Sequence, residues 1–164
     1  MADNALTRSL TMGALCAVVG MLTGLVIVQM ATGDGYEAFL IGAPLAAFVT
    51  GSLLWWLFRV RPRRYGPLGG AITGAAAGAI AHYVCWYGFI LWSAACYAAT
   101  GGCTDSLGSA PMDPIFGIAG AALYALISLI AFGWFTVPAG AAIGGVLAYV
   151  QGRSGSVPLS LSQE

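Results

Sequence analysis

The stretch GPLGGAITGAAAGAIAHYVCWY, residues 66–87, decides the fold of this chain. Glycine recurs in it at every fourth position, and two further steps of four reach His82 and Trp86. The glycines at this spacing are Gly66, Gly70, Gly74 and Gly78. A segment so rich in Gly and Ala is a weak helix in water. In lipid, the same segment predicts a transmembrane helix with one bare edge, along which a neighbouring helix can approach closely.

The composition of the whole chain indicates that lipid is its main solvent. Of its 164 residues, 59% are hydrophobic and only 7% are charged, whereas soluble domains carry about 25% charged residues. A soluble fold could not cover its surface with so few charges. We therefore predict an all-α integral membrane protein, with residues 1–164 forming one polytopic domain in a lipid bilayer and making no contact with nucleic acid.

Four apolar segments separated by polar turns predict four transmembrane helices. Their expected bounds are about 9–31, 38–58, 67–99 and 115–150. A bilayer core of ~30 Å needs about 20 helical residues, so the third and fourth helices are long. Pro138 is expected to kink or break the fourth; we favour one long kinked helix, and the alternative is a span to about Phe135 followed by a short re-entrant or interfacial helix. Residues 151–164 are Ser-rich and are expected to be a flexible tail.

The charged residues separate by sign across the predicted membrane. The basic residues are Arg8, Arg59, Arg61, Arg63, Arg64 and Arg153, and all fall on one side. The two loops on the other side contain Asp34, Glu37, Asp105 and Asp113 and no basic residue. Because cytoplasmic loops are enriched in basic residues, four spans predict that both termini are cytoplasmic. In a bacterium this places the chain in the inner membrane with its acidic loops in the periplasm.

Small residues at four-residue spacing predict how the helices meet. The expected helix-packing residues are Gly66, Gly70, Gly74, Gly78, Gly140 and Gly144. The segment 67–74 resembles 138–145, which leaves internal duplication open, although the two Gly-rich halves also lie at the same predicted depth and are suited to close antiparallel packing. We expect this packing within one chain, and contact with other membrane subunits or with a second copy is the alternative.

His82 is the only histidine and lies in or near the hydrocarbon of the predicted third span. Cys85 and Trp86 follow three and four residues later, so both neighbour it on a helix surface. A haem or zinc site needs further strong ligands, which the spans do not supply. We expect a neutral His82 bonded to a hydroxyl or carbonyl group of a facing helix, with no metal and no cofactor. Ligand or pigment binding at His82 is the alternative.

Aromatic side chains gather around and beyond His82 in the third span. They are Tyr83, Trp86, Tyr87, Trp92 and Tyr97. Such residues commonly form a belt at the membrane–water boundary. The alternative is a surface for a lipid tail, a quinone, a pigment or a partner helix, with His82, Tyr83, Trp86 and Tyr87 as the contact residues.

Cys96 and Cys103 flank a short Gly-containing segment on the predicted outer side. An oxidising compartment would favour a disulfide between them, but their spacing does not establish one, because geometry decides whether a pair can close. Cys16 and Cys85 read as small apolar residues embedded in the membrane.

The predicted spans contain no Asp, Glu, Lys or Arg. Ion-coupled transporters and proton pumps carry such groups along their pathways, and the common phosphate-loop, zinc-protease and serine-hydrolase motifs do not occur. We therefore expect a protein that is not an enzyme but a non-catalytic accessory or structural subunit of a larger membrane assembly, of respiratory or photosynthetic type. A small homo-oligomeric channel or facilitator is the alternative, and cofactor or pigment binding centred on His82 is the third hypothesis.

Overall fold

The structure, a computed structural model, describes residues 2–32, 35–104 and 108–154. Four long helices dominate this part of the chain: α1 (Ala2–Met30), α2 (Phe39–Trp55), α3 (Pro67–Thr100) and α4 (Pro114–Ser154). Four helical segments are long and apolar enough to cross a membrane, and the described residues form no strand. The prediction of an all-α chain with four helices long and apolar enough to span a membrane is confirmed.

Two helices continue beyond the apolar segments that predicted them. α1 begins at Ala2 rather than near residue 9, and α4 ends at Ser154 rather than near residue 150. Hydropathy marks the part of a helix suited to hydrocarbon, whereas the backbone hydrogen bonds of a helix can continue through polar residues. Residues 155–164, the rest of the expected tail, lie outside the described part of the chain.

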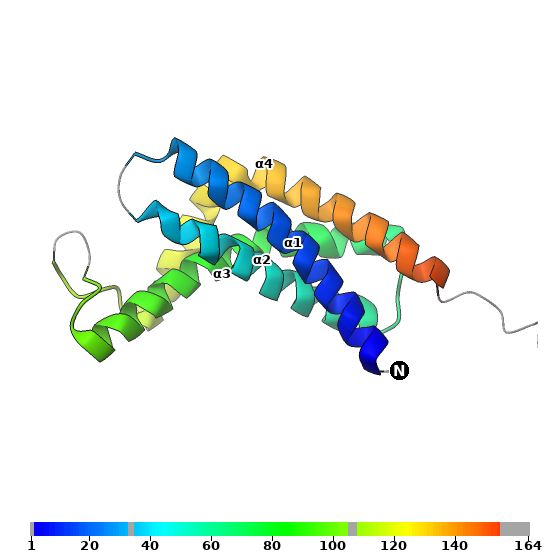
Figure 1. The fold of residues 1–164 in the computed structure, drawn as a ribbon, viewed down its shortest axis with the longest axis horizontal. Helices are drawn as coiled ribbons and strands as arrows, with labels where there is room; N and C mark the ends of the chain where they lie inside the picture. The colour runs from blue at the N-terminus through cyan, green and yellow to red at the C-terminus, as the bar shows by residue number, and fades with distance from the viewer. Residues whose placement is uncertain (1, 33–34, 105–107, 155–164) are drawn as a thin grey trace, which may run out of the picture.

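The four helices run alternately up and down. Figure 1 shows the start of α1, the α2–α3 connection and the end of α4 at one end of the molecule, which we call the arginine end. The α1–α2 connection and the loop between α3 and α4 lie at the other end, the loop end. At the arginine end, the guanidinium carbon of Arg8 lies 5.1 Å from the centre of the Tyr65 ring, so the start of α1 contacts the residues that precede α3.

Two short turns of different winding flank α2. η1 (Tyr36–Ala38) is a 3-10 turn that leads into the helix, and η2 (Trp56–Val60) is a π-helical turn that extends its end. The π-helical turn η2 includes a hydrogen bond between residues five apart: the Arg61 N–H donates to the Trp56 carbonyl oxygen at an N–O distance of 2.9 Å. Pro62 has no N–H with which to continue the helix, and the chain then turns toward α3.

The sequence on both sides of the α3–α4 loop suits the helix ends. α3 is capped by Gly101, whose φ of 68° is left-handed and strain-free for glycine, and whose N–H donates to the Tyr97 carbonyl oxygen at 2.8 Å. α4 begins at Pro114. The Asp113 carboxylate oxygen Oδ1 accepts a hydrogen bond from the Ile115 N–H at 2.8 Å, which caps the first turn of α4.

α4 is one continuous helix that passes through Pro138. The long form expected from the sequence is therefore the one observed, without a separate short helix after Phe135. Pro138 has no N–H, so the carbonyl of Trp134 lacks its usual helical donor. Figure 1 shows the ribbon of α4 changing direction where its colour passes from yellow to orange.

Backbone contact between α1 and α2 depends on glycines of α1. A Cβ atom added at Gly20 would lie 2.7 Å from the carbonyl oxygen of Ala43, and one added at Gly24 would lie 2.6 Å from that of Phe39. Both distances are too short for any real side chain. The two helices therefore pack as closely as their backbones allow, which maximises dispersion contacts where lipid supplies no hydrophobic driving force.

Polar side chains of α2 and η2 contact α4 and α3 near the arginine end. The indole nitrogen Nε1 of Trp55, whose side chain is 0% exposed, donates to Gln151 Oε1 of α4 at 3.2 Å. The Arg59 guanidinium donates through Nε to the Thr73 hydroxyl of α3 at 2.8 Å. These bonds join the α1–α2 pair to the α3–α4 pair at one level of the molecule, and the site described next lies further toward the loop end.

Candidate functional site: a cavity between the four helices

A cavity of about 60 Å³ lies between the helices, and all four of them line it. None of the lining residues is charged. Small and aliphatic side chains make up most of the wall. The lining residues with polar or aromatic side chains are Cys16, Thr23, Phe39, His82, Cys85, Trp86, Ser128 and Thr136.

His82 lies at this cavity and is tied to α4 through both of its ring nitrogens. Nδ1 is 2.6 Å from the Ser128 hydroxyl oxygen, and Nε2 is 2.9 Å from that of Thr136. The Thr136 hydroxyl also donates to the Phe132 carbonyl oxygen at 3.2 Å, so its oxygen is left to accept the proton of Nε2. Of the two neutral tautomers, the network fits the one protonated at Nε2, in which Nδ1 accepts from Ser128.

The two ring nitrogens of His82 both make hydrogen bonds at this cavity. Among residues 2–32, 35–104 and 108–154, no three His, Cys, Asp or Glu side chains come together as a metal ion would require. Both ring nitrogens of His82 are occupied by hydroxyl groups. Cys16 and Cys85 line the same cavity as buried free thiols.

Trp86 forms the aromatic wall of the cavity together with Phe39. Their ring centres are 5.3 Å apart in an edge-to-face arrangement, and Tyr124 stacks on Trp86 at 4.9 Å. The indole nitrogen Nε1 of Trp86 is buried and has no hydrogen-bond partner among the described residues. A buried donor without a partner is unfavourable by about 1–3 kcal/mol, so Trp86 is the unsatisfied group of this site.

The other two predicted contact residues do not line the cavity. Tyr83 and Tyr87 stack on each other with ring centres 5.9 Å apart, and the Tyr83 hydroxyl donates to the Ile118 carbonyl oxygen of α4 at 3.5 Å. The structure thus divides the predicted set into His82 and Trp86 at the cavity and the two tyrosines beside it. Trp92, further along α3, is 72% exposed.

The predicted packing glycines lie where α3 and α4 touch, with one exception. A Cβ atom at Gly74 would collide with the Gly140 carbonyl oxygen, and one at Gly70 would collide with that of Gly144. At Gly78 a Cβ atom would lie 2.7 Å from the carbonyl oxygen of Thr136, the residue that bonds His82. This seam therefore sets how closely His82 approaches α4.

Gly66 is the exception and takes no part in the seam. A Cβ atom there would meet nothing within 4 Å. The residue is the extended N-cap of α3, with φ −67° and ψ 134°. The four-residue spacing of glycines thus begins one residue before α3 does. Sequence periodicity alone does not show where a helix begins.

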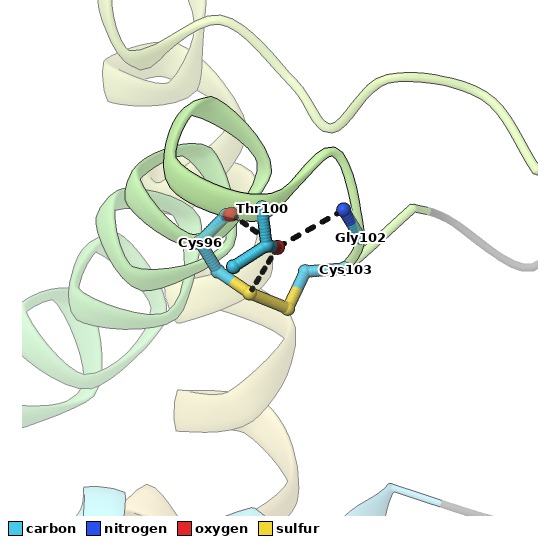
Figure 2. Close-up of a disulfide and its surroundings, with 4 residues drawn as sticks. All are labelled: Cys96, Thr100, Gly102 and Cys103. Atoms are coloured by element: carbon cyan, nitrogen blue, oxygen red, sulfur yellow. Dashed lines mark hydrogen bonds between the residues drawn. A yellow bond between two sulfur atoms is a disulfide. The ribbon is translucent and has the colours of Figure 1, made fainter.

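A disulfide joins Cys96 in the last turns of α3 to Cys103 in the following loop, with Cα atoms 5.9 Å apart. Figure 2 shows the Thr100 side chain beside it. The Thr100 hydroxyl donates to the Cys96 carbonyl oxygen at 2.8 Å and accepts from the Gly102 N–H at 3.0 Å. The pairing that the sequence left open is thus present, and the turn that ends α3 is both cross-linked and hydrogen-bonded.

The residues of the site that sequence reasoning missed are Ser128, Thr136, Phe39 and Tyr124. A signal existed for the first two, because Ser128 and Thr136 are hydroxyl residues about two helical turns apart in an otherwise apolar segment. They therefore lie on one face of α4. Nothing in the sequence indicates that this face of α4 meets His82. Nor does it indicate that Phe39 and Tyr124 pack on Trp86, since both are far from Trp86 in the chain.

Comparison of the chain with protein-family models, with curated proteins and with solved structures finds no match. The class therefore rests on the fold and the site. The chain is a multi-pass membrane protein of four apolar helices, with an uncharged cavity between them.

Proposed function

We propose that this chain is a non-catalytic subunit of a larger protein assembly in a cell membrane, with respiratory and photosynthetic complexes as natural hosts. The observation that carries the proposal is a pair of helix segments whose side chains are mostly exposed among the described residues, apart from the inner end, where Phe89 packs on Phe39 and Tyr124 on Trp86. These segments are residues 88–100 of α3 and 114–127 of α4, which we call the outer arm.

The outer arm carries large apolar side chains on almost every side. In its α4 segment, the buried residues are Gly117, Ala121 and Ala125, at the four-residue spacing of one narrow face. A Cβ atom at Gly117 would contact Ile90 of α3, so this face meets the other half of the arm. Around it, Ile115 and Phe116 are 76% and 77% exposed. The two segments of the arm therefore contact each other along one narrow face, and most of their remaining surface is exposed.

α3 and α4 are longer than a helix needs to be to cross a bilayer, and the outer arm contains their additional length. At 1.5 Å per residue, the 34 residues of α3 extend about 51 Å and the 41 residues of α4 about 61 Å, against about 39 Å for the 26-residue apolar part of α1. A bilayer is about 40–45 Å thick with its headgroups. Figure 1 shows the arm diverging from the α1–α2 pair toward the loop end. Apolar surface beyond the hydrocarbon favours coverage by protein.

We propose further that both termini are cytoplasmic and that the membrane is a bacterial inner membrane. The segments that hold the arginines lie together at the arginine end, while Glu37 and Asp113 belong to the connections at the loop end. Asp34 and Asp105, the other acids of these connections, lie outside the described residues. A disulfide at the loop end supports an oxidising compartment there.

A homo-oligomeric channel remains the alternative prediction. The cavity of about 60 Å³ in one chain is too small for a conducting path, so a pore would have to lie between chains. The seam glycines Gly70, Gly74, Gly78, Gly140 and Gly144 pack within the chain, which leaves the outer arm as the surface for such contacts. Purification of the chain with its native partners therefore separates the two functions, since a channel would yield a complex of identical chains.

The test is purification of the tagged chain from its native membrane in mild detergent, with stoichiometry measured by native mass spectrometry. We expect a different membrane polypeptide in a fixed ratio to the chain. Replacing two outer-arm residues, Phe116→Ala with Ile115→Ala, should reduce its recovery about tenfold or more, because exposed apolar residues of the arm form the contact.

The matched control is Val18→Ala with Val26→Ala, since both valines are exposed on α1. This pair should leave recovery of the other polypeptide unchanged. A chain that purifies alone, or equal losses from both pairs of substitutions, would overturn the proposal. A complex made only of identical chains would favour the channel.

A further inference from the structure

We propose that residues 59–64, in the connection between α2 and α3, bind the phosphate group of one anionic phospholipid through Arg63 and Arg64. The acyl chains of this lipid would lie along α3. We call residues 59–64 the arginine turn. The inference is independent of the proposed function, because the arginine turn and the outer arm lie at opposite ends of the molecule.

The arginine turn concentrates positive charge in a short, closed segment. Four of its six residues are arginine, and the other two are Val60 and Pro62. The Arg63 N–H donates to the Val60 carbonyl oxygen at 3.2 Å. The Arg64 N–H donates to the Arg59 carbonyl oxygen at 3.1 Å, and the Arg59 guanidinium donates to the Arg64 carbonyl oxygen at 3.4 Å. These bonds fold the segment back on itself, so that four cationic side chains start from one small region.

Two of the four arginines are held by the chain itself, and two are not. Arg59 donates through Nε to a hydroxyl group of α3 at 2.8 Å, and the guanidinium carbon of Arg61 lies 6.0 Å from the centre of the Trp56 ring. Arg63 and Arg64 are exposed, and within the described part of the chain their guanidinium groups form no hydrogen bond or ion pair. These two groups therefore remain available to a ligand.

The charge at this end of the molecule favours an anionic ligand. Four of the six acids of the sequence belong to the connections at the loop end. Only Asp3 and Glu164 remain for the six arginines. The planar guanidinium group binds phosphate oxygens through two parallel hydrogen bonds, and two adjacent arginines can share the oxygens of one phosphate. Clusters of arginine at the end of a transmembrane helix are suited to anionic headgroups.

Exposed apolar side chains beside the arginine turn make a phospholipid a better match than a free phosphate ion. Leu68 and Ile72 lie one helical turn apart on α3 and are 76% and 61% exposed. Each immediately precedes a residue that the Arg59 guanidinium contacts, Gly69 or Thr73. At 3.6 residues per turn, the two apolar side chains therefore lie on the neighbouring face of the helix. A ligand with an anionic headgroup and apolar chains can contact both surfaces at once.

The backbone at Arg63 supports a role for its side chain. Its φ of 54° is left-handed, a conformation that glycine adopts freely and that other residues adopt rarely. A turn that served only to reverse the chain would favour glycine here. An unfavourable backbone conformation that places a charged side chain at an exposed turn is typical of functional positions.

Native mass spectrometry of the purified full-length chain tests the proposal with two lipids that share their acyl chains. The probes are dioleoyl phosphatidylglycerol, which is anionic, and dioleoyl phosphatidylcholine, which has no net charge. We expect one phosphatidylglycerol molecule per chain to bind saturably, about tenfold or more tightly than phosphatidylcholine. Equal binding of the two lipids, or uptake of phosphatidylglycerol without saturation, would overturn the proposal.

Inorganic phosphate distinguishes a lipid from a free anion as the ligand. At millimolar concentration it should not displace phosphatidylglycerol, because it has no acyl chains to contact Leu68 and Ile72. Displacement would mean that the arginine turn holds a free anion, and would overturn the assignment to a lipid.

Removal of charge locates the site. Arg63→Gln with Arg64→Gln should weaken phosphatidylglycerol binding about tenfold or more, since each arginine near a membrane surface contributes about a fivefold factor. The matched control is Arg8→Gln with Arg153→Gln, which removes the same charge from the same end. Both of these arginines lie over tyrosine rings and belong to α1 and α4, so this pair should have a clearly smaller effect. Equal losses from both pairs would indicate diffuse attraction to the whole end and overturn the proposal.

Arg63→Gly separates the lipid contact from the fold. Glycine removes the guanidinium group and is compatible with the left-handed backbone at this position. We expect the variant to unfold at a higher temperature in detergent and to bind phosphatidylglycerol about fivefold more weakly. Unchanged binding would overturn the role of Arg63 as a phosphate contact. A lower unfolding temperature would contradict the unfavourable backbone conformation from which that role is argued.

Discussion

His82 shows how one residue can join two helices. Its ring lies on α3 and its two hydroxyl partners lie on α4. In transmembrane helices such bonds contribute about 0.6 kcal/mol each on average. We expect His82→Ala to lower the free energy of unfolding by about 1–2 kcal/mol, measured in mixed micelles titrated with a denaturing detergent. Ser128→Ala removes one of the two bonds and should have a smaller effect. An unchanged midpoint for His82→Ala would contradict this role.

Trp55 and Trp56 are neighbours in sequence with opposite surroundings. Trp55 is 0% exposed and donates to Gln151 of α4, whereas Trp56 is 43% exposed. Trp55→Phe leaves a void and removes the donor of a buried acceptor, so we expect a loss of about 1–3 kcal/mol in unfolding free energy. Trp56→Phe should change it by less than about 0.5 kcal/mol. Comparable losses from both substitutions would count against the Trp55–Gln151 contact.

The partners of single residues were not accessible from the sequence. The histidine was expected to meet a hydroxyl or carbonyl group of a facing helix, and Ser128 and Thr136 are such groups. Their identity depends on how α4 is rotated about its axis and shifted along α3. The unpaired indole of Trp86 is a stronger example, because an unsatisfied donor is defined only by what surrounds it.

At the scale of helices, the glycine seam of α3 and α4 carries the sharpest prediction. A Cβ atom at Gly74 would collide with the backbone of α4, whereas one at Gly88 on the same helix would meet nothing within 4 Å. Gly74→Ala should therefore destabilise the chain by about 1–3 kcal/mol, since the two backbones must move apart. Gly88→Ala should be neutral or slightly stabilising, because Ala is the better helix former. The same denaturing-detergent titration measures both, and the opposite order would refute the seam.

Hydropathy predicted the number and approximate position of the helices. It did not predict the residues at which they begin and end. The helix starts at Pro67 and Pro114 have local causes, namely a proline in the first turn and, for α4, the Asp113 cap. The start of α1 and the end of α4 continue into polar sequence. Continuity through Pro138 also had to be observed, because whether the chain re-forms its helix after a proline depends on the neighbours that support it.

At the scale of the whole molecule, the arrangement of charges predicts an orientation that labelling can measure. After mild reduction, a membrane-impermeant maleimide should reach Cys103 only from the side opposite the cytoplasm in sealed vesicles of known orientation. Arg64→Cys, in a chain with Cys96→Ser and Cys103→Ser, should be labelled only from the cytoplasmic side. Cys16 and Cys85 are buried and should stay unlabelled. The chain with Cys96→Ser and Cys103→Ser alone is the control, because it should show no labelling from either side. Cytoplasmic labelling of Cys103 would reverse the proposed topology.

Composition and hydropathy were sufficient to predict four long apolar helices, because both properties can be read from the chain segment by segment and a segment in lipid must satisfy its own backbone hydrogen bonds. The cavity, the hydroxyl pair on His82, the unpaired indole of Trp86 and the uncovered outer arm arise only in the tertiary structure. Each depends on how helices that are distant in sequence are rotated and shifted relative to one another. In lipid, close packing between helix surfaces determines this rotation and shift, and no local sequence pattern does.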